Sequence, residues 1–120
     1  MRYVIYREAD RGYGSPKIFY YFPDGEENLT PGEIAVDFEK QSVKLIKPAE
    51  GDMPFIMGQE QATLIRDVMR KSAGEKLVQE LTAGIEGREF YPYGFFAVVS
   101  LKEHLMAGGL PVQNVVVIEG

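Results

Sequence analysis

The apolar positions of residues 58–85 follow a helical period, but their phase changes halfway. At about 100° per residue, the apolar side chains of the first half fall on one side of a helix and those of the second half on the opposite side. Between the halves, Ser72 and Glu75 have the spacing of a capping box, which starts a new helix. We therefore predict two helices, at 59–70 and 73–83, with Gly84 as the stop. The alternative is one kinked helix.

An alternation with a period of two predicts strands in the first half of the chain. The first two runs carry apolar or aromatic residues on both faces, which is typical of strands that lie inside a sheet or under a partner chain. The third run alternates cleanly, with Ile34, Val36 and Phe38 on the expected core side, and the fourth completes a hairpin with one solvated face. The predicted strands are 2–7, 17–22, 33–39 and 43–47.

The last third of the chain contains further short elements. We expect an extended aromatic segment at 88–94, where Pro92 excludes a central position in a sheet. The apolar run that follows predicts a buried strand, and Ser100 with Glu103 repeats the capping-box spacing. The predicted elements are a strand at 95–99, a short helix at 101–107 and a final strand at 112–118, whose pairing, parallel or antiparallel, stays open.

The predicted order ββββ-αα-β-α-β indicates the α+β class. We expect a largely antiparallel sheet of about six strands, mixed if the last strand pairs in parallel, with a helix pair and one short helix. The chain has 120 residues, which suits a single globular domain, 1–120, with a core of its own.

The composition is that of a soluble protein. Hydrophobic residues make up 45% and charged residues 26% of the chain, and there is no apolar run near the ~20 residues that span a bilayer. Charges at Arg2 and Arg7 come too early for a signal peptide. The chain has no cysteine, which excludes disulfides, thiolate metal sites and cysteine nucleophiles. We expect a cytoplasmic protein that does not associate with membranes.

The net charge of −5 is mild, and no basic stripe is present to bind phosphates. The second helix of the pair carries Lys76 and Gln79 beside Glu75 and Glu80, which does not favour reading of DNA bases. These features do not favour nucleic-acid binding. The carboxylates lack the spacing of a metal site, and no cofactor motif is present, so we expect neither a metal nor a cofactor. An acidic protein that blocks a nucleic-acid enzyme remains a further possibility.

One segment suits an anion. Arg11 and Lys17 flank Gly12 and Gly14, whose backbone N–H groups could approach a phosphate, although a flexible hairpin tip has the same composition. His104 is the only histidine and hence the only candidate proton carrier of that type; a partly exposed histidine near the end of a short helix is the simpler interpretation.

Aromatic residues are the most prominent feature, with 7 tyrosines and 7 phenylalanines. Three short helices cannot cover both faces of the aromatic strands, and tyrosine tolerates half-exposure at interfaces. We predict an interface formed by Tyr3, Tyr6, Tyr20, Tyr21, Tyr91 and Tyr93. The alternatives are that the chain's own loops and the 90–94 segment cover this face, or that it lines a pocket or stacks bases.

These observations favour a small protein-binding module, a regulator, inhibitor or subunit that pairs with another protein or with itself as a homodimer. We expect it to lack catalysis of its own. The alternative is a domain that binds or converts a phosphate-bearing small molecule through Arg11, Gly12, Gly14, Lys17 and His104.

Overall fold

The computed structural model describes residues 1–9 and 16–119, and the chain forms two compact units. Unit 1 comprises Met1–Met53 and Tyr91–Gly120, and unit 2 comprises Pro54–Phe90. That the chain behaves as one domain stays a prediction.

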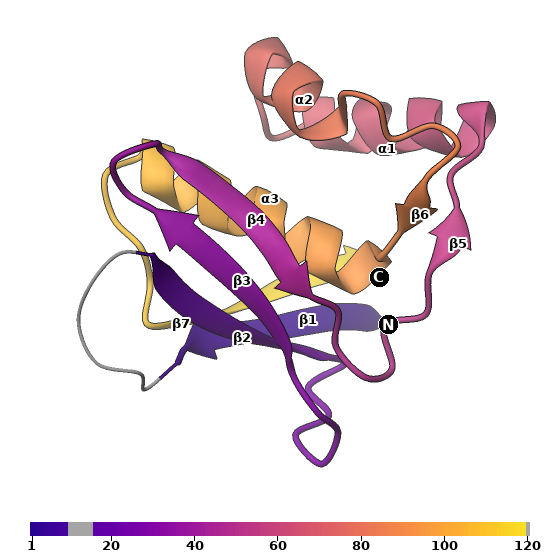
Figure 1. The fold of residues 1–120 in the computed structure, drawn as a ribbon. Coiled ribbons are helices and arrows are strands. Elements are labelled where there is room, and N and C mark those ends of the chain that lie inside the picture. Colours follow the sequence, from indigo (N-terminus) through magenta and orange to yellow (C-terminus); the bar gives the residue numbers. More distant parts are fainter. Residues whose placement is uncertain (10–15, 120) are drawn as a thin grey trace. The chain divides into compact units, whose positions relative to one another are not determined.

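Unit 1 is an antiparallel sheet with a helix packed on it (Figure 1). The strand order is β4-β3-β2-β1-β7, and helix α3 (Pro92–Met106) contacts all five strands. Every pairing is antiparallel, and β1 and β2 lie inside the sheet, as their two apolar faces predicted. The last strand pairs with β1. The strands are β1 (Arg2–Glu8), β2 (Lys17–Pro23), β3 (Gly32–Asp37), β4 (Ser42–Lys47) and β7 (Gln113–Glu119).

The strand registers decide which side chains form the core of unit 1. Successive side chains of a strand point to opposite faces. The fully buried set belongs to the face under α3, and the inward direction predicted for Ile34 and Val36 is confirmed. Phe38 was predicted inward as well, and this is wrong: β3 ends at Asp37, and Phe38 lies in the following turn, 43% exposed. The fully buried core residues of the sheet are Val4, Tyr6, Phe19, Tyr21, Ile34 and Val36.

The predicted strand at 95–99 is wrong, because these residues form the middle of α3. A short run that is apolar on all sides fits a buried helix as well as a buried strand, and periodicity alone does not separate them. Pro92 stands at the first position of the helix, where its missing N–H costs no hydrogen bond. Ser100 is therefore inside the helix rather than at its start, and the predicted short helix is the C-terminal part of α3.

Unit 2 contains two helices and two short strands. Strands β5 (Phe55–Ile56) and β6 (Glu89–Phe90) are antiparallel and enclose α1 (Gln59–Arg70) and α2 (Glu75–Thr82) in the sequence (Figure 1). The prediction of two helices is confirmed, and Gly84, with φ +70°, follows the end of α2. The capping box is wrong. Gly74 is the N-cap and has no side-chain cap, while the Glu75 carboxylate accepts hydrogen bonds from Arg70 at 2.7 and 3.1 Å.

The α+β class and the largely antiparallel sheet are thus confirmed. The total differs in detail from the prediction: unit 1 holds five strands and unit 2 holds two, and the third helix is 15 residues long.

Candidate functional site

The six tyrosines predicted at an interface divide between two environments. Tyr6 and Tyr21 are fully buried under α3, and Tyr93 is buried in the first turn of that helix, so their rings are covered by their own chain. Tyr3, Tyr20 and Tyr91 are partly exposed. Contact of these three with a partner stays a prediction.

Tyr21 belongs to a buried network that holds the start of α3. Its hydroxyl donates to Asp52 Oδ2 at 2.7 Å and accepts from the Ala49 N–H at 2.9 Å. The Asp52 carboxylate also accepts from the N–H groups of Tyr93 at 3.2 Å and Gly94 at 2.9 Å. These are first-turn N–H groups, which have no partner inside the helix. Asp52 therefore caps α3 from a distant loop, and its charge suits the helix N-terminus.

Tyrosine ionisation is suppressed at this end of unit 1. Burial, followed by a hydrogen bond to Asp24 at 2.8 Å and the charge of that carboxylate, raises the pKa of Tyr93 to about 12. Burial raises the pKa of Tyr21 further above its ordinary value, and the Asp52 carboxylate adds to this effect. Both hydroxyls are therefore hydrogen-bond donors and not proton carriers at neutral pH.

Tyr6 belongs to a second polar cluster, where α3 crosses β1 and β7. Its hydroxyl hydrogen-bonds to Ser100 Oγ at 2.9 Å and accepts from Asn114 Nδ2 at 3.2 Å. The same Asn114 Nδ2 lies 3.4 Å from His104 Nε2. Ser100 and His104 are one helical turn apart and face the sheet together. The cluster satisfies four polar side chains at the helix–sheet boundary, and it contains no acidic partner to orient the histidine as a base.

The face of the sheet opposite α3 carries exposed apolar side chains next to its β7 edge. Val115 and Val117 are 51% and 58% exposed, and the register places them beside Ile5 and Tyr3 of β1. We call these four residues the β7 patch. Exposing two β-branched side chains on one face of an edge strand to water is unfavourable in free energy. A partner that covers them removes this cost.

A loop of the same chain covers the neighbouring part of this face. A Cβ atom on Gly25 would lie 3.0 Å from Tyr3 Oη and 3.2 Å from Ile5 Cδ1, so the turn after β2 packs against both side chains. Further along, Arg7 lies 4.5 Å above the Phe22 ring and pairs with Glu27. A side chain of β1 thus covers Phe22, and the turn after β2 packs against Tyr3 and Ile5, whereas Val115 and Val117 stay exposed. That the chain's own loops cover the aromatic face as a whole stays a prediction.

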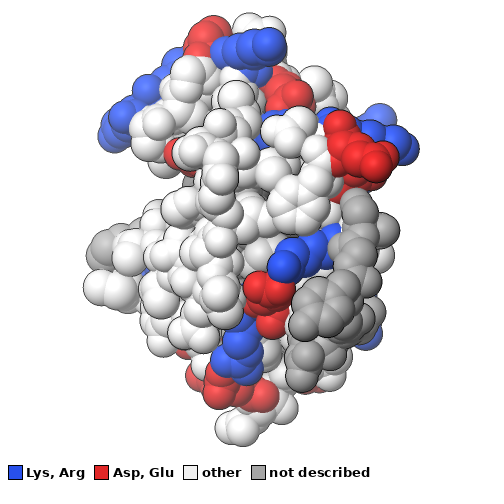
Figure 2. All heavy atoms as spheres, turned by 90° about the vertical axis from the view of Figure 1, so that its left-hand side faces the viewer, with Lys and Arg blue, Asp and Glu red and all other residues white. Residues whose placement is uncertain are grey.

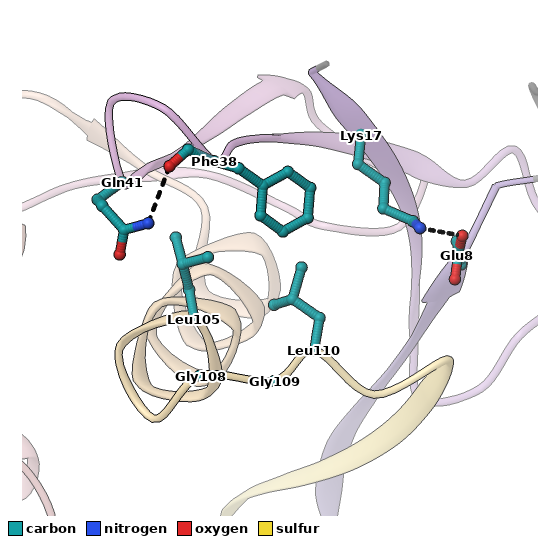
Figure 3. A pocket seen from close by; sticks show the side chains of 8 residues that line it. All are labelled: Glu8, Lys17, Phe38, Gln41, Leu105, Gly108, Gly109 and Leu110. Atoms are coloured by element: carbon teal, nitrogen blue, oxygen red, sulfur yellow. Dashed lines mark hydrogen bonds and ion pairs between the residues drawn. The ribbon is translucent and has the colours of Figure 1, made fainter. Parts of the chain in front are cut away.

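A pocket of about 380 Å³ lies at the C-terminal end of α3 (Figure 3). Phe38, Leu105 and Leu110 give it an apolar wall, and the ion pair of Lys17 with Glu8 stands at one side. Gly108, with φ +93°, ends the helix there, and its N–H donates to the Leu105 carbonyl at 3.2 Å. The pocket is suited to a small, mostly apolar molecule with one polar group.

The structure brings together only part of the predicted anion site. Lys17 lines the pocket, but its ammonium group is paired with Glu8, which repels an anion. His104 is not among the described residues that line the pocket, and it contacts Asn114 instead. Arg11, Gly12 and Gly14 lie outside the described residues.

Charge is mixed on the face shown in Figure 2, where Lys and Arg side chains alternate with Asp and Glu. In unit 2, a groove of about 350 Å³ contains Arg66 and Arg70. Arg66 binds Thr82 and Glu86, and Arg70 binds Asp67 and Glu75, with the result that the pKa of both glutamates is lowered by their arginine partners. These guanidinium groups are therefore engaged within the chain.

Sequence reasoning missed Asp52, Ser100 and Asn114. Asp52 sits in a loop with no motif, and Ser100 was assigned to a helix start. Val115 and Val117 belong to an unbroken apolar run, residues 115–118, which gives no signal for the side chains that stay exposed.

Within the described parts of the chain, no group of three or more His, Asp or Glu side chains is placed to hold a metal ion. None of the helices that the structure describes has the length and apolar character needed to cross a bilayer. The chain has no significant match among protein-family models, curated proteins or solved structures.

Proposed function

We propose that this protein is a binding module that recognises another protein through the β7 patch and works as a regulator, inhibitor or subunit, without catalysis of its own. The observation that carries the proposal is the exposure of Val115 and Val117, beside Tyr3 and Ile5, on a sheet whose other face is filled by α3. Burial of such residues is the main favourable term in protein association.

The surface that this chain offers to a partner is apolar at its centre and has charges at its rim. Arg7 and Glu27 border the patch as a pair, so they can orient a partner without presenting a single sign of charge. Tyr20, which neighbours Arg7 in the register, extends the surface across β2 as a partly exposed aromatic. A cysteine-free chain suits work in the reducing cytoplasm.

Site-specific cross-linking in the host cell tests this function. A photo-reactive phenylalanine analogue replaces Val117 in one variant and Met106 in the other; both native residues are 58% exposed. We expect the label at 117 to capture a defined protein in stoichiometric yield and the label at 106 to capture none. Equal capture at the two positions, or none at 117, would contradict the proposal.

We propose, as a second candidate function, the binding of a phosphate-bearing small molecule in the pocket at the end of α3. Its support is the presence of Lys17 in the wall of a cavity with apolar sides. Such a ligand would have to separate Lys17 from Glu8, so we expect weaker binding than at an unpaired lysine. A shift in melting temperature with nucleotides, lost in Lys17→Met but kept in Lys47→Met, is the test; no shift with the native chain would exclude it.

A further inference from the structure

The outer edge of β7 has backbone hydrogen-bonding groups that the sheet does not use. The Glu8 N–H donates to the Val112 carbonyl, and Tyr6 and Val4 pair with Asn114 and Val116. In an antiparallel ladder the bonded positions alternate, so the backbone groups of residues 113, 115 and 117 point away from β1. The Val115 N–H agrees with this, because it donates at 2.9 Å to the Asn114 side chain and not to β1.

The two edges of the sheet differ in their protection. β4, at one edge, carries the exposed lysines Lys44 and Lys47, and charged side chains on an edge strand prevent pairing with another chain. β7, at the other edge, has the sequence QNVVVIE, with neither a proline nor a lysine. Its first six residues carry no charge. An unprotected edge of this kind is the surface that an added strand occupies.

We infer that the strand added to β7 is the β7 of a second copy of this chain, in antiparallel register about a two-fold axis at Val116. This inference rests on the proposed function and names its partner. In that register Val115 pairs with the partner's Val117, and Val117 with the partner's Val115. All of these have outward backbone groups, so each pair exchanges two hydrogen bonds once the Val115 N–H exchanges the Asn114 side chain for the partner strand.

The same register joins the two β7 patches. The valines at 115 and 117 of both copies lie on one face as direct cross-strand neighbours, flanked by Tyr3 and Ile5 of each copy. Residues 113–118 are uncharged, so no like charges meet when the strand pairs with itself. A register centred on Val115 would instead place Gln113 opposite Val117 and leave part of the apolar surface unmatched. Self-pairing thus covers the exposed valines and also gives hydrogen-bond partners to the outward backbone groups of β7.

Sedimentation velocity with a cysteine cross-link tests the inference. The native chain has no cysteine, so Val116→Cys introduces a single thiol, which the two-fold axis brings opposite its copy at a Cα separation of about 4.5 Å. We expect a dimer that gains a disulfide in Val116→Cys under mild oxidation, and none in Ile46→Cys on β4, which is 56% exposed.

Val115→Pro removes one outward N–H and leaves the ladder with β1 intact, so we expect it to abolish the dimer. Val117→Lys serves the same purpose if the proline variant does not fold. A native chain that stays monomeric over about three decades of concentration would overturn self-pairing. A dimer that persists in both variants would also overturn self-pairing. Capture of a different protein at position 117 would leave the proposed function standing while this inference fails.

Discussion

The Tyr21 hydroxyl and the Asp52 carboxylate, 31 residues apart in the chain, meet at 2.7 Å inside unit 1. Asp52 uses the same carboxylate to cap α3, so this pair connects the middle of the sheet to the start of the helix that covers it. The relationship explains why two tyrosines expected at an interface are internal. Tyr21 and Tyr93 position α3, and the exposed valines of β7 lie on the other face of the sheet.

Tyr21→Phe should lower the free energy of unfolding by about 1–3 kcal/mol, because the Ala49 N–H loses its acceptor and Asp52 loses a donor inside the protein. Urea titration followed by far-UV circular dichroism measures the change. Tyr3→Phe, at a partly exposed tyrosine on the opposite face, is the matched control, with an expected change within about 0.5 kcal/mol. Equal losses in the two variants would contradict the role given to the pair.

Gly32→Ala should destabilise unit 1, because the added Cβ would lie 2.0 Å from the Tyr21 ring and 2.7 Å from the Ala49 nitrogen. Neither the packed ring nor the backbone can retreat far, and overpacking of a core costs about 1–3 kcal/mol. A matched control is Gly109→Ala, where no atom lies within 4 Å of the added Cβ. Melting temperatures of the two variants should therefore differ clearly, with Gly32→Ala the lower.

Stability should fall in alkaline solution. The pKa of Tyr93 is raised from 10.0 to about 12 in the folded protein, so the unfolded chain loses this proton first. The stabilisation from Tyr93 is complete below pH about 10 and is lost as the pH rises through about 12. The raised pKa of Tyr21 acts in the same direction. Urea midpoints measured across this range should drop, and the drop should be smaller in Tyr93→Phe; an equal drop would show that Tyr93 is not its source.

The two helices of unit 2 offer a prediction of increased stability. Gly74 is the N-cap of α2, with φ −71° and ψ 158°, and a Cβ there meets nothing within 4 Å. Gly74→Ser should therefore stabilise the helix by a few tenths of a kcal/mol, roughly, through a new cap. Gly84→Ser should destabilise, because φ is +70° at that position. Thermal melts that shift in the same direction for both variants would contradict this assignment.

Local patterns were sufficient for much of the fold. The helical period and its phase change predicted α1 and α2, and the aromatic content of both strand faces predicted that β1 and β2 lie inside the sheet. The same patterns failed at 95–99, where an apolar run supports strand and helix equally, and at Phe38, where the turn begins one residue before the alternation ends. The local pattern of apolar and polar residues does not determine the element type of a short apolar run or the residue at which a strand ends.

The candidate site was less predictable, because it depends on pairing between distant segments. The cap from Asp52 and the cluster of Tyr6 with Asn114 join residues that are 42 and 108 positions apart, and no spacing rule reaches so far. Tyr3, Tyr6, Tyr20 and Tyr21 lie on β1 and β2, but the face that α3 covers follows only from the registers of β1, β2 and β7. Because α3 covers one face, Tyr6 and Tyr21 are buried, and the exposed side chains of the other face include Tyr3 and the valines of β7.

Native mass spectrometry of the protein, purified gently from its own host, shows whether the β7 patch binds another protein. We expect a complex, at twice the mass of the chain or at the mass of the chain plus one other protein, and we expect Val117→Lys to lose it. A chain that carries no second protein, in the native form as in the variant, would contradict this expectation.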